Sequence, residues 1–176
     1  RNNNIPHTLY NMYPSTKKVP TEQEALLRLS SLCSRSEHST GEMREKLRRW
    51  GVDSDTSERV VARLVSERFV DDERYCRFFV RDKIRFDRWG RRKIEQALYA
   101  KGVCQDISAA VLDEVDDEEW TEALRPLLDS KRRTVKGATD YERNGKLIRF
   151  AMSRGFGMDI IRRCMDVNDD VEEDVF

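Results

Sequence analysis

The sequence is poor in the residues that usually hold metals and disulfides. It has two histidines, and its four cysteines form no Cys-x-x-Cys pair. A structural zinc site and a disulfide framework are therefore not expected. We interpret Cys76 and Cys164 as small core residues, because both fall on the apolar faces of expected helices.

Long apolar stretches are also missing. No run of about eighteen apolar residues occurs, so we expect no membrane span. The first residues lack the basic start and apolar stretch of a secretory signal. With these features we expect a protein of the cytoplasm.

Sequence motifs of enzymes are absent as well. The chain contains no glycine-rich phosphate loop, no nucleophile elbow and no pair of residues at metal-ligand spacing. We therefore expect no catalytic residue, no cofactor and no bound metal, and we expect a protein that works by binding a partner.

The chain has no net charge, but its charges are segregated. Residues 81–93 hold seven bases and two acids, residues 131–149 again hold seven bases and two acids, and residues 113–122 hold seven acids and no base. Such a run is by itself as well explained by a solvated helix face. Two basic blocks with an acidic block between them favour a directional binding surface. Hydrophobic and charged residues each make up 38% of the chain, which favours thin helical units over one thick core.

An internal repeat is the most informative feature of the sequence. Gly51, Gly102 and Gly155 are separated by 51 and 53 residues. Similar residues recur at fixed positions around them. Eight residues before lie Met43, Ile94 and Leu147; four before lie Leu47, Leu98 and Ala151; one after lie Val52, Val103 and Phe156; four after lie Asp55, Asp106 and Asp159; nine and ten after lie Val60–Val61, Val111–Leu112 and Cys164–Met165.

The repeat predicts a helix, a tight turn and a second helix around each glycine. Apolar residues eight and four positions before the glycine share one helix face. Glycine accepts the left-handed conformation that ends a helix, and the next apolar residue folds back over that end. We expect the aspartates Asp55, Asp106 and Asp159 to cap the following helices and the apolar pairs to face inward.

A further helix precedes each of these helix pairs. Its expected starts are the capping box Thr21–Glu24, Asp71–Asp72 and the acidic run 116–119. Pro126 lies within the third of these helices, which predicts a kink or a later start. We therefore expect an all-α fold of three tandem three-helix, helix-turn-helix-like repeats at 21–70, 71–115 and 116–168, stacked as an elongated, curved array. Residues 1–20 are expected to form a loosely ordered tail and residues 169–176 an acidic tail.

Several segments of the chain resemble the RecX family of regulatory proteins. The central one runs from Phe69 through Val70-Asp71-Asp72-Glu73-Arg74-Tyr75-Cys76 to Arg85, Gly90, Lys93-Ile94 and Leu98-Tyr99-Ala100-Lys101-Gly102-Val103. The first repeat is similar at Ala25-Leu26, Ser39, Glu42, Leu47 and Trp50-Gly51-Val52, and the third is a looser match. Cys76 replaces the alanine that is usual at that position. The resemblance covers residues 21–167.

The resemblance implies a function in regulating recombination. Members of this family bind the RecA filament on single-stranded DNA, block its extension or promote its loss, and so reduce strand exchange and the SOS co-protease activity. We therefore expect a monomer whose partners are the RecA filament and, weakly and without sequence preference, single-stranded DNA.

The basic blocks supply the candidate binding residues, since arginine and lysine contact both carboxylates and phosphates. They are Arg81, Lys83, Arg85, Arg88, Arg91, Arg92, Lys93, Lys101, Lys131, Arg132, Arg133 and Lys136. Arg149, Arg154, Arg162 and Arg163 either extend the second cluster or belong to solvated helix faces. Trp89 either stacks on a base or, as we favour, packs in the core, where we also expect Trp50 and Trp120.

Two other functions fit a three-helix repeat. One is a sequence-specific transcription factor. However, residues 57–60 and 107–110 of the expected third helices have few of the basic and short polar side chains that read bases. The other is a helical scaffold that binds only proteins and shows no dependence on DNA.

Overall fold

The computed structural model describes residues 18–165. This part of the chain contains nine α-helices, one turn of π-helix and no strand. The first group is α1 (Glu22–Cys33), α2 (Thr40–Arg49) and α3 (Ser54–Ser66). The second is α4 (Asp72–Asp82), η1 (Lys83–Asp87), α5 (Arg91–Ala100) and α6 (Gln105–Asp113), and the third is α7 (Asp117–Arg132), α8 (Asp140–Ser153) and α9 (Met158–Met165).

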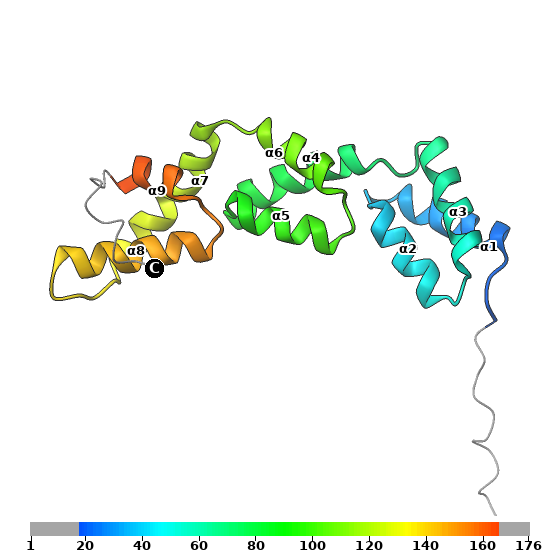
Figure 1. The fold of residues 1–176 in the computed structure, drawn as a ribbon, viewed down its shortest axis with the longest axis horizontal. Coiled ribbons are helices and arrows are strands. Elements are labelled where there is room, and N and C mark those ends of the chain that lie inside the picture. Colours follow the sequence, from blue (N-terminus) through cyan, green and yellow to red (C-terminus); the bar gives the residue numbers. More distant parts are fainter. Residues whose placement is uncertain (1–17, 166–176) are drawn as a thin grey trace, which may run out of the picture.

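The three groups follow one another along an elongated, curved molecule (Figure 1). The expected all-α fold of three three-helix units is thus confirmed. The expected unit boundaries, after residues 70 and 115, fall in the connections between α3 and α4 and between α6 and α7. The expected tails at 1–20 and 169–176 lie outside the described residues, apart from Lys18, Val19 and Pro20, and the last three residues of the expected third unit lie outside as well.

The first and second helices of the units begin at side-chain caps, except α5, whose N-cap is Gly90. Thr21 and Ser39 each form a capping box, with Glu24 and Glu42 respectively. The third helices begin two residues earlier than the sequence analysis expected: the N-caps of α3 and α6 are Asp53 and Cys104. The prediction that Asp55, Asp106 and Asp159 cap these helices was therefore wrong. All three lie in the first helical turn, where a negative charge is favourable beside the amide end of the helix dipole.

The three repeat glycines end α2, α5 and α8 as expected. Their φ angles are 77°, 71° and 94° for Gly51, Gly102 and Gly155, which is the left-handed region. In each turn the glycine amide donates to the carbonyl three residues back, and the next amide donates to the carbonyl five residues back. Val52, for example, donates to Leu47 at 3.1 Å. This is the two-bond pattern of the Schellman motif, and the following apolar residue is buried in all three units.

The core has two parts, although the chain has three units. One cluster lies within the first unit, and the other runs continuously through the second and third. Trp120 is buried in the second cluster, while Trp50 packs half-buried against the first, as expected for core residues. In α9 the fully buried pair is Ile160 and Ile161, and the expected pair Cys164–Met165 is only half-buried.

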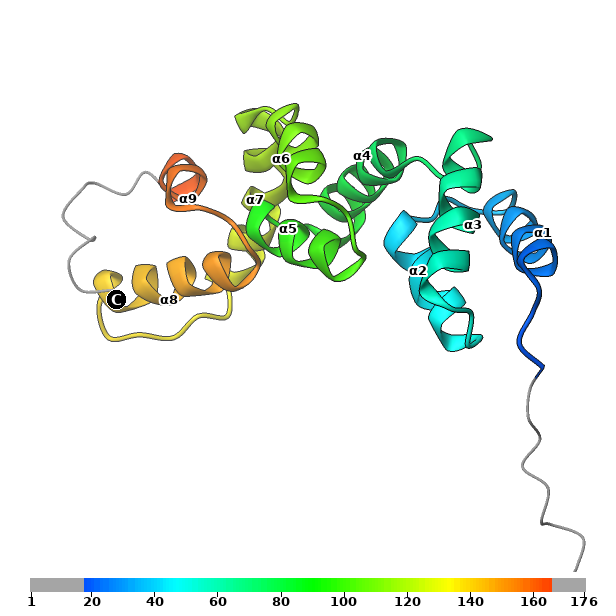
Figure 2. The same cartoon turned by 45° about the vertical axis from the view of Figure 1, so that its right-hand side comes forward.

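The second helices of the three units form a row. Two views at 45° to each other show α8, α5 and α2 in line, with the end of α8 against the start of α5 and the end of α5 against the start of α2 (Figures 1 and 2). The two joints use equivalent positions. At one joint the Gly90 amide donates to the Arg154 carbonyl at 2.8 Å, and at the other the Ser39 hydroxyl donates to the Lys101 carbonyl.

Glycines allow the backbones to approach at these joints. A Cβ atom on Gly41 would lie 2.5 Å from the Gly102 Cα and from the Lys101 carbonyl oxygen. A Cβ atom on Gly90 would lie 2.3 Å from the carbonyl carbon of Gly155. Carbonyls at the ends of α8 and α5 thus accept hydrogen bonds from the start of the second helix of the preceding unit.

Two local features depart from the sequence analysis. The π-helical turn η1 follows α4 directly and ends at Arg88, whose φ of 52° is left-handed without glycine. Pro126 does not delay its helix, because α7 begins at Asp117 behind the Asp116 cap and continues through Pro126 to Arg132. The later start that Pro126 suggested was therefore wrong.

The four cysteines are free, and they differ in exposure. Cys76 is fully buried as expected, and Cys164 is half-buried, while Cys104 is exposed. Burial raises the pKa of the Cys76 thiol to about 11, so this group stays protonated and unreactive near neutral pH.

Alkylation of the native protein with iodoacetamide should therefore modify Cys104 first and Cys76 last. Peptide mass spectrometry after timed quenching measures the two rates. In denaturant the rates should converge, which separates burial from the intrinsic reactivity of each sequence. Native labelling of Cys76 as fast as Cys104 would contradict the buried position.

Candidate functional site

The exposed side of α4 and η1 carries two arginines without ion pairs within residues 18–165 and two exposed phenylalanines. Phe78, Arg81 and Arg85 follow one another at spacings of three and four residues and so share one helix face. Arg85 lies over the ring of Phe86 at 5.4 Å, and Phe78 and Phe86 are 55% and 70% exposed. We call these four residues the α4–η1 face. Neither arginine has a carboxylate partner among the described residues.

Other bases of this block are held by the protein itself. Lys83 pairs with Asp87 at 2.6 Å, and Arg91 pairs with Glu95 at 3.0 Å and with Asp113 at 2.7 Å. Because their charge is compensated, Lys83 and Arg91 are weaker candidates for binding a partner. Arg92 is exposed, and within residues 18–165 its side chain has no such pairing.

Two further predicted residues lie at structural contacts. Arg88 donates to the Glu122 carbonyl at 3.5 Å and so connects the second unit to α7 of the third. Lys93 lies over the ring of Trp89 at 4.7 Å, and Lys83 lies over the same ring at 4.9 Å. Trp89 itself is half-buried against the core. These contacts favour the core-packing interpretation of Trp89 over stacking on a base.

The second basic block surrounds a hollow of about 390 Å³ in the third unit. It is lined by Lys131, Thr134, Val135, Lys136, Lys146, Arg149 and Phe150, and we call it the third-unit hollow. Of the predicted residues it brings together Lys131 and Lys136. Arg132 pairs instead with Asp129 at 3.5 Å, and Arg133 is exposed outside the lining.

Lys146 and Phe150 were not among the predicted binding residues. The signal that could have found them is the spacing of Lys146, Arg149 and Phe150, which places three side chains on one side of α8. Arg149 extends the cluster as one interpretation expected, whereas Arg163 pairs with Asp117 at 2.7 Å. Arg154 belongs to the joint, where its guanidinium donates to the Asp87 carbonyl.

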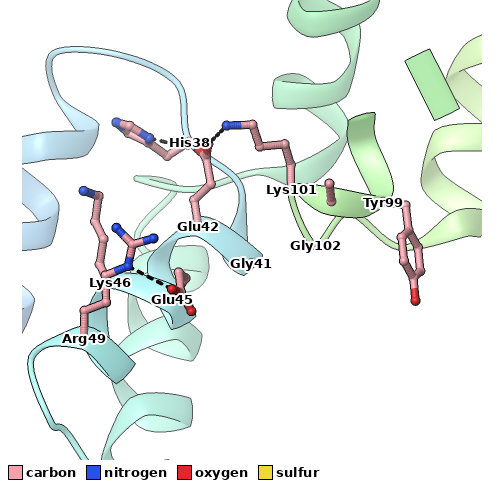
Figure 3. A pocket seen from close by; sticks show the side chains of 10 residues that line it. His38, Gly41, Glu42, Glu45, Lys46, Arg49, Tyr99, Lys101 and Gly102 are labelled. Carbon is pink, nitrogen blue, oxygen red and sulfur yellow. Dashed lines mark hydrogen bonds and ion pairs between the residues drawn. The ribbon is translucent and has the colours of Figure 1, made fainter. Parts of the chain in front are cut away.

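Lys101 lies at the joint between the first and second units. It pairs with Glu42 at 2.9 Å on one side of a cleft of about 560 Å³, shown in Figure 3. His38 contacts the other oxygen of Glu42 at 3.1 Å. Burial by itself would raise the pKa of Glu42, but hydrogen bonds from Lys101, the Ser39 amide and His38 outweigh it and lower the pKa. Glu42 is therefore ionised at neutral pH, and Lys101 is a joint residue.

Figure 3 also shows that the ring of Tyr99 points away from the His38–Glu42–Lys101 cluster. Tyr99 is 82% exposed and lies at the edge of the cleft. In residues 18–165 no group of three or more His, Cys, Asp and Glu side chains is placed to hold a metal ion. None of the described helices is long and apolar enough to cross a membrane.

Comparison with known proteins matches all three units. Models of the first, second and third three-helix domains of RecX match residues 27–64, 71–112 and 117–165 respectively. The regulatory protein RecX of Prosthecochloris aestuarii is 33% identical over 144 residues, which cover 82% of this chain and 93% of the relative. Those of Clostridium botulinum and Lactobacillus johnsonii are 33% and 30% identical over 69% and 82% of this chain.

The clostridial and lactobacillar relatives are longer than this chain. The matches span 57% and 53% of their length. Two crystal structures have the same fold. RecX from Lactobacillus salivarius gives a TM-score of 0.77 at 19% identity over 82% of this chain and 94% of that chain, and another regulatory protein RecX gives 0.76 at 20% over 83% and 73%. The sequence matches along three successive helical units, supported by this common fold, place the chain in the RecX family of regulatory proteins.

Proposed function

We propose that this protein binds the RecA filament on single-stranded DNA and inhibits its extension and its activities in recombination and SOS co-proteolysis. It acts as a monomer in the cytoplasm, by contacts to protein and phosphate and without a catalytic step. The observation that carries the proposal is the α4–η1 face, which presents two uncompensated arginines beside two exposed phenylalanines in the middle of the array.

The composition of this face suits a protein partner with acidic surface. Arginine forms paired hydrogen bonds with carboxylates and phosphates, and exposed aromatic side chains are enriched at protein interfaces. Binding would cost no broken internal ion pair at Arg81 or Arg85. The middle position in the array also allows the neighbouring units to add contacts on either side.

The acidic side chains at the end of α6 and the start of α7 oppose tight binding to DNA alone. Asp113, Glu114 and residues 116–119 are all exposed, and of these Asp116, Glu118 and Glu119 have no ion pair within the described residues. Their charges repel phosphate, and the basic clusters must overcome this repulsion. Affinity for naked single-stranded DNA should therefore be modest and sensitive to salt.

A transcription factor is less well supported by the third helices. Two bases of α3 are compensated, Arg59 by Glu22 at 2.9 Å and Arg63 by Glu67 at 2.8 Å. Helix α6 contains no lysine or arginine. A base-reading helix commonly presents uncompensated arginine or lysine side chains to the major groove, and neither helix does.

The first test is inhibition of RecA from the same organism. The protein is titrated into RecA preassembled on single-stranded DNA, and the DNA-stimulated hydrolysis of ATP is followed. Substoichiometric protein should inhibit, and Arg81→Glu/Arg85→Glu should need about ten times more protein, because two favourable charges become repulsive.

Lys18→Glu/Arg35→Glu is the matched control. It makes the same change in charge at two exposed residues, one just before the first unit and one within it, and should inhibit like the parent protein. Circular dichroism checks that both variants remain helical. No inhibition by folded parent protein would exclude the RecA filament as target, and equal binding to RecA with and without DNA would favour a protein-binding scaffold.

A further inference from the structure

We propose that the third-unit hollow is a binding site for the phosphodiester backbone of single-stranded nucleic acid. Its ligating groups are Lys131, Lys136, Lys146 and Arg149. The α4–η1 face, in contrast, contacts protein. This division of the two basic surfaces rests on the proposed function, whereas the phosphate site is argued from the hollow alone.

The charge of the hollow is uncompensated. Four cationic side chains line it, and its lining contains no aspartate or glutamate. None of the four has an ion pair within residues 18–165, whereas Arg132, Arg143 and Arg163 of the third unit each pair with an aspartate. Cations gathered around one cavity repel each other, and this repulsion is relieved when a polyanion enters.

The hollow is also organised in advance. Its rim is the connection between α7 and α8, which is held to α8 at three successive backbone groups: the Lys136 carbonyl accepts from Lys146 at 2.6 Å, the Gly137 carbonyl accepts from Arg143, and the Ala138 amide donates to Glu142 at 2.8 Å. A fixed rim reduces the entropy lost on binding. The long polar connection of the third unit, which the repeat alone does not explain, thus serves as the fixed rim of the hollow.

The geometry favours phosphate over bases as the recognised group. The ammonium of Lys131 lies 5.2 Å from the centre of the Phe150 ring and so occupies the ring that a base would need for stacking. Binding through phosphates carries no sequence preference. A flexible single strand can turn successive phosphates toward the four cations that line this hollow of about 390 Å³.

The test measures binding of a fluorescent oligothymidylate to the full chain in the absence of RecA. Fluorescence anisotropy is recorded at several salt concentrations for the parent protein and for Lys136→Gln/Arg149→Gln. The variant should bind about tenfold more weakly, and the slope of log affinity against log salt should fall by about 1.4, which is two phosphate contacts at about 0.7 each. Neither side chain donates a hydrogen bond within the described protein, so the fold should be retained.

Two controls separate this site from general electrostatics. Arg81→Gln/Arg85→Gln removes the same charge from the α4–η1 face and should change the affinity by less than about threefold. Lys136→Arg/Arg149→Lys keeps the charge and should bind like the parent. Equal losses in the two Gln variants, or no loss in Lys136→Gln/Arg149→Gln, would overturn the proposal.

Competition identifies the source of the phosphate. Unlabelled oligothymidylate should displace the probe, and inorganic pyrophosphate at the same phosphate concentration should not. Displacement by pyrophosphate alone would assign the hollow to free phosphates and overturn a strand-binding site. Unchanged DNA binding with lost inhibition of RecA would assign it to a protein contact and also overturn the proposal. Because RecA is absent from the binding assay, its outcome does not depend on whether RecA is inhibited.

Discussion

Phe156→Ala is expected to lower the free energy of unfolding by about 3–5 kcal/mol. Phe156 is 1% exposed and is the largest of the fully buried side chains. It follows the turn at Gly155 and belongs to the core cluster that spans the second and third units. Its removal leaves a cavity in a core that both units share, so both should lose stability together.

Amide hydrogen exchange measures this effect unit by unit. In Phe156→Ala, protection should fall in α4–α9 and remain near the parent level in α1–α3. Val52→Ala is the matched control, because Val52 occupies the equivalent position in the first unit and contacts the other core cluster. It should lower protection in α1–α3 alone. A loss confined to α7–α9 in Phe156→Ala would show that the second and third units do not share a cooperative core.

Gly41→Ala is expected to destabilise the joint of the first and second units by about 1–3 kcal/mol. Alanine is ordinarily better than glycine in a helix by up to about 1 kcal/mol, so the joint reverses the usual sign. The reason is that the added Cβ would lie 2.5 Å from the Gly102 Cα, and two backbones cannot separate without loss of the contacts around Ser39 and Lys101.

Gly145→Ala is the control for this substitution. Gly145 lies within α8, and an added Cβ would meet only the Arg149 guanidinium, at 3.5 Å. This variant should be stabilised by up to about 1 kcal/mol. Thermal unfolding measures whether each substitution stabilises or destabilises the protein. Small-angle X-ray scattering should detect a more extended particle only for Gly41→Ala. Stabilisation by both substitutions would mean that the joint is not closely packed.

The sequence predicts the parts of this fold that depend on local interactions. Gly51, Gly102 and Gly155 could be identified because a left-handed turn favours glycine, and the apolar residues before them because a helix repeats every 3.6 residues. The N-cap residues of the helices were harder to predict. An aspartate at Asp55 or at Asp53 satisfies the same rule, and only the backbone shows that Asp53 accepts the bond from the Thr56 amide.

Features that depend on distant residues could not be predicted in this way. The contact between Gly41 and Gly102 joins two helices far apart in the chain, and neither glycine alone indicates a partner. The shared core of the second and third units has the same origin. The turn η1 also has no sequence signal that we could have used, since the residue that ends it, the C-cap Arg88, adopts a left-handed conformation without being glycine or asparagine.

The charge distribution of the sequence predicts the candidate binding residues, and the ion pairs in the structure narrow that set. The sequence locates both basic blocks, but it treats Arg85 and Arg91 alike. Only the structure separates Arg85, which lies over Phe86, from Arg91, which is held by Glu95 and Asp113. Whether these blocks bind the filament and DNA stays a prediction.

The row of α8, α5 and α2 gives the molecule a polarity. Peptide dipoles add along a helix, and at each joint the negative carbonyl end of one helix meets the positive amide end of the next. The row therefore has one unmatched amide end, at Thr139, and one unmatched carbonyl end, at Gly51. A helical filament also has two different ends. Such a partner would distinguish the two ends of the row and could accept this protein in one direction along the filament axis.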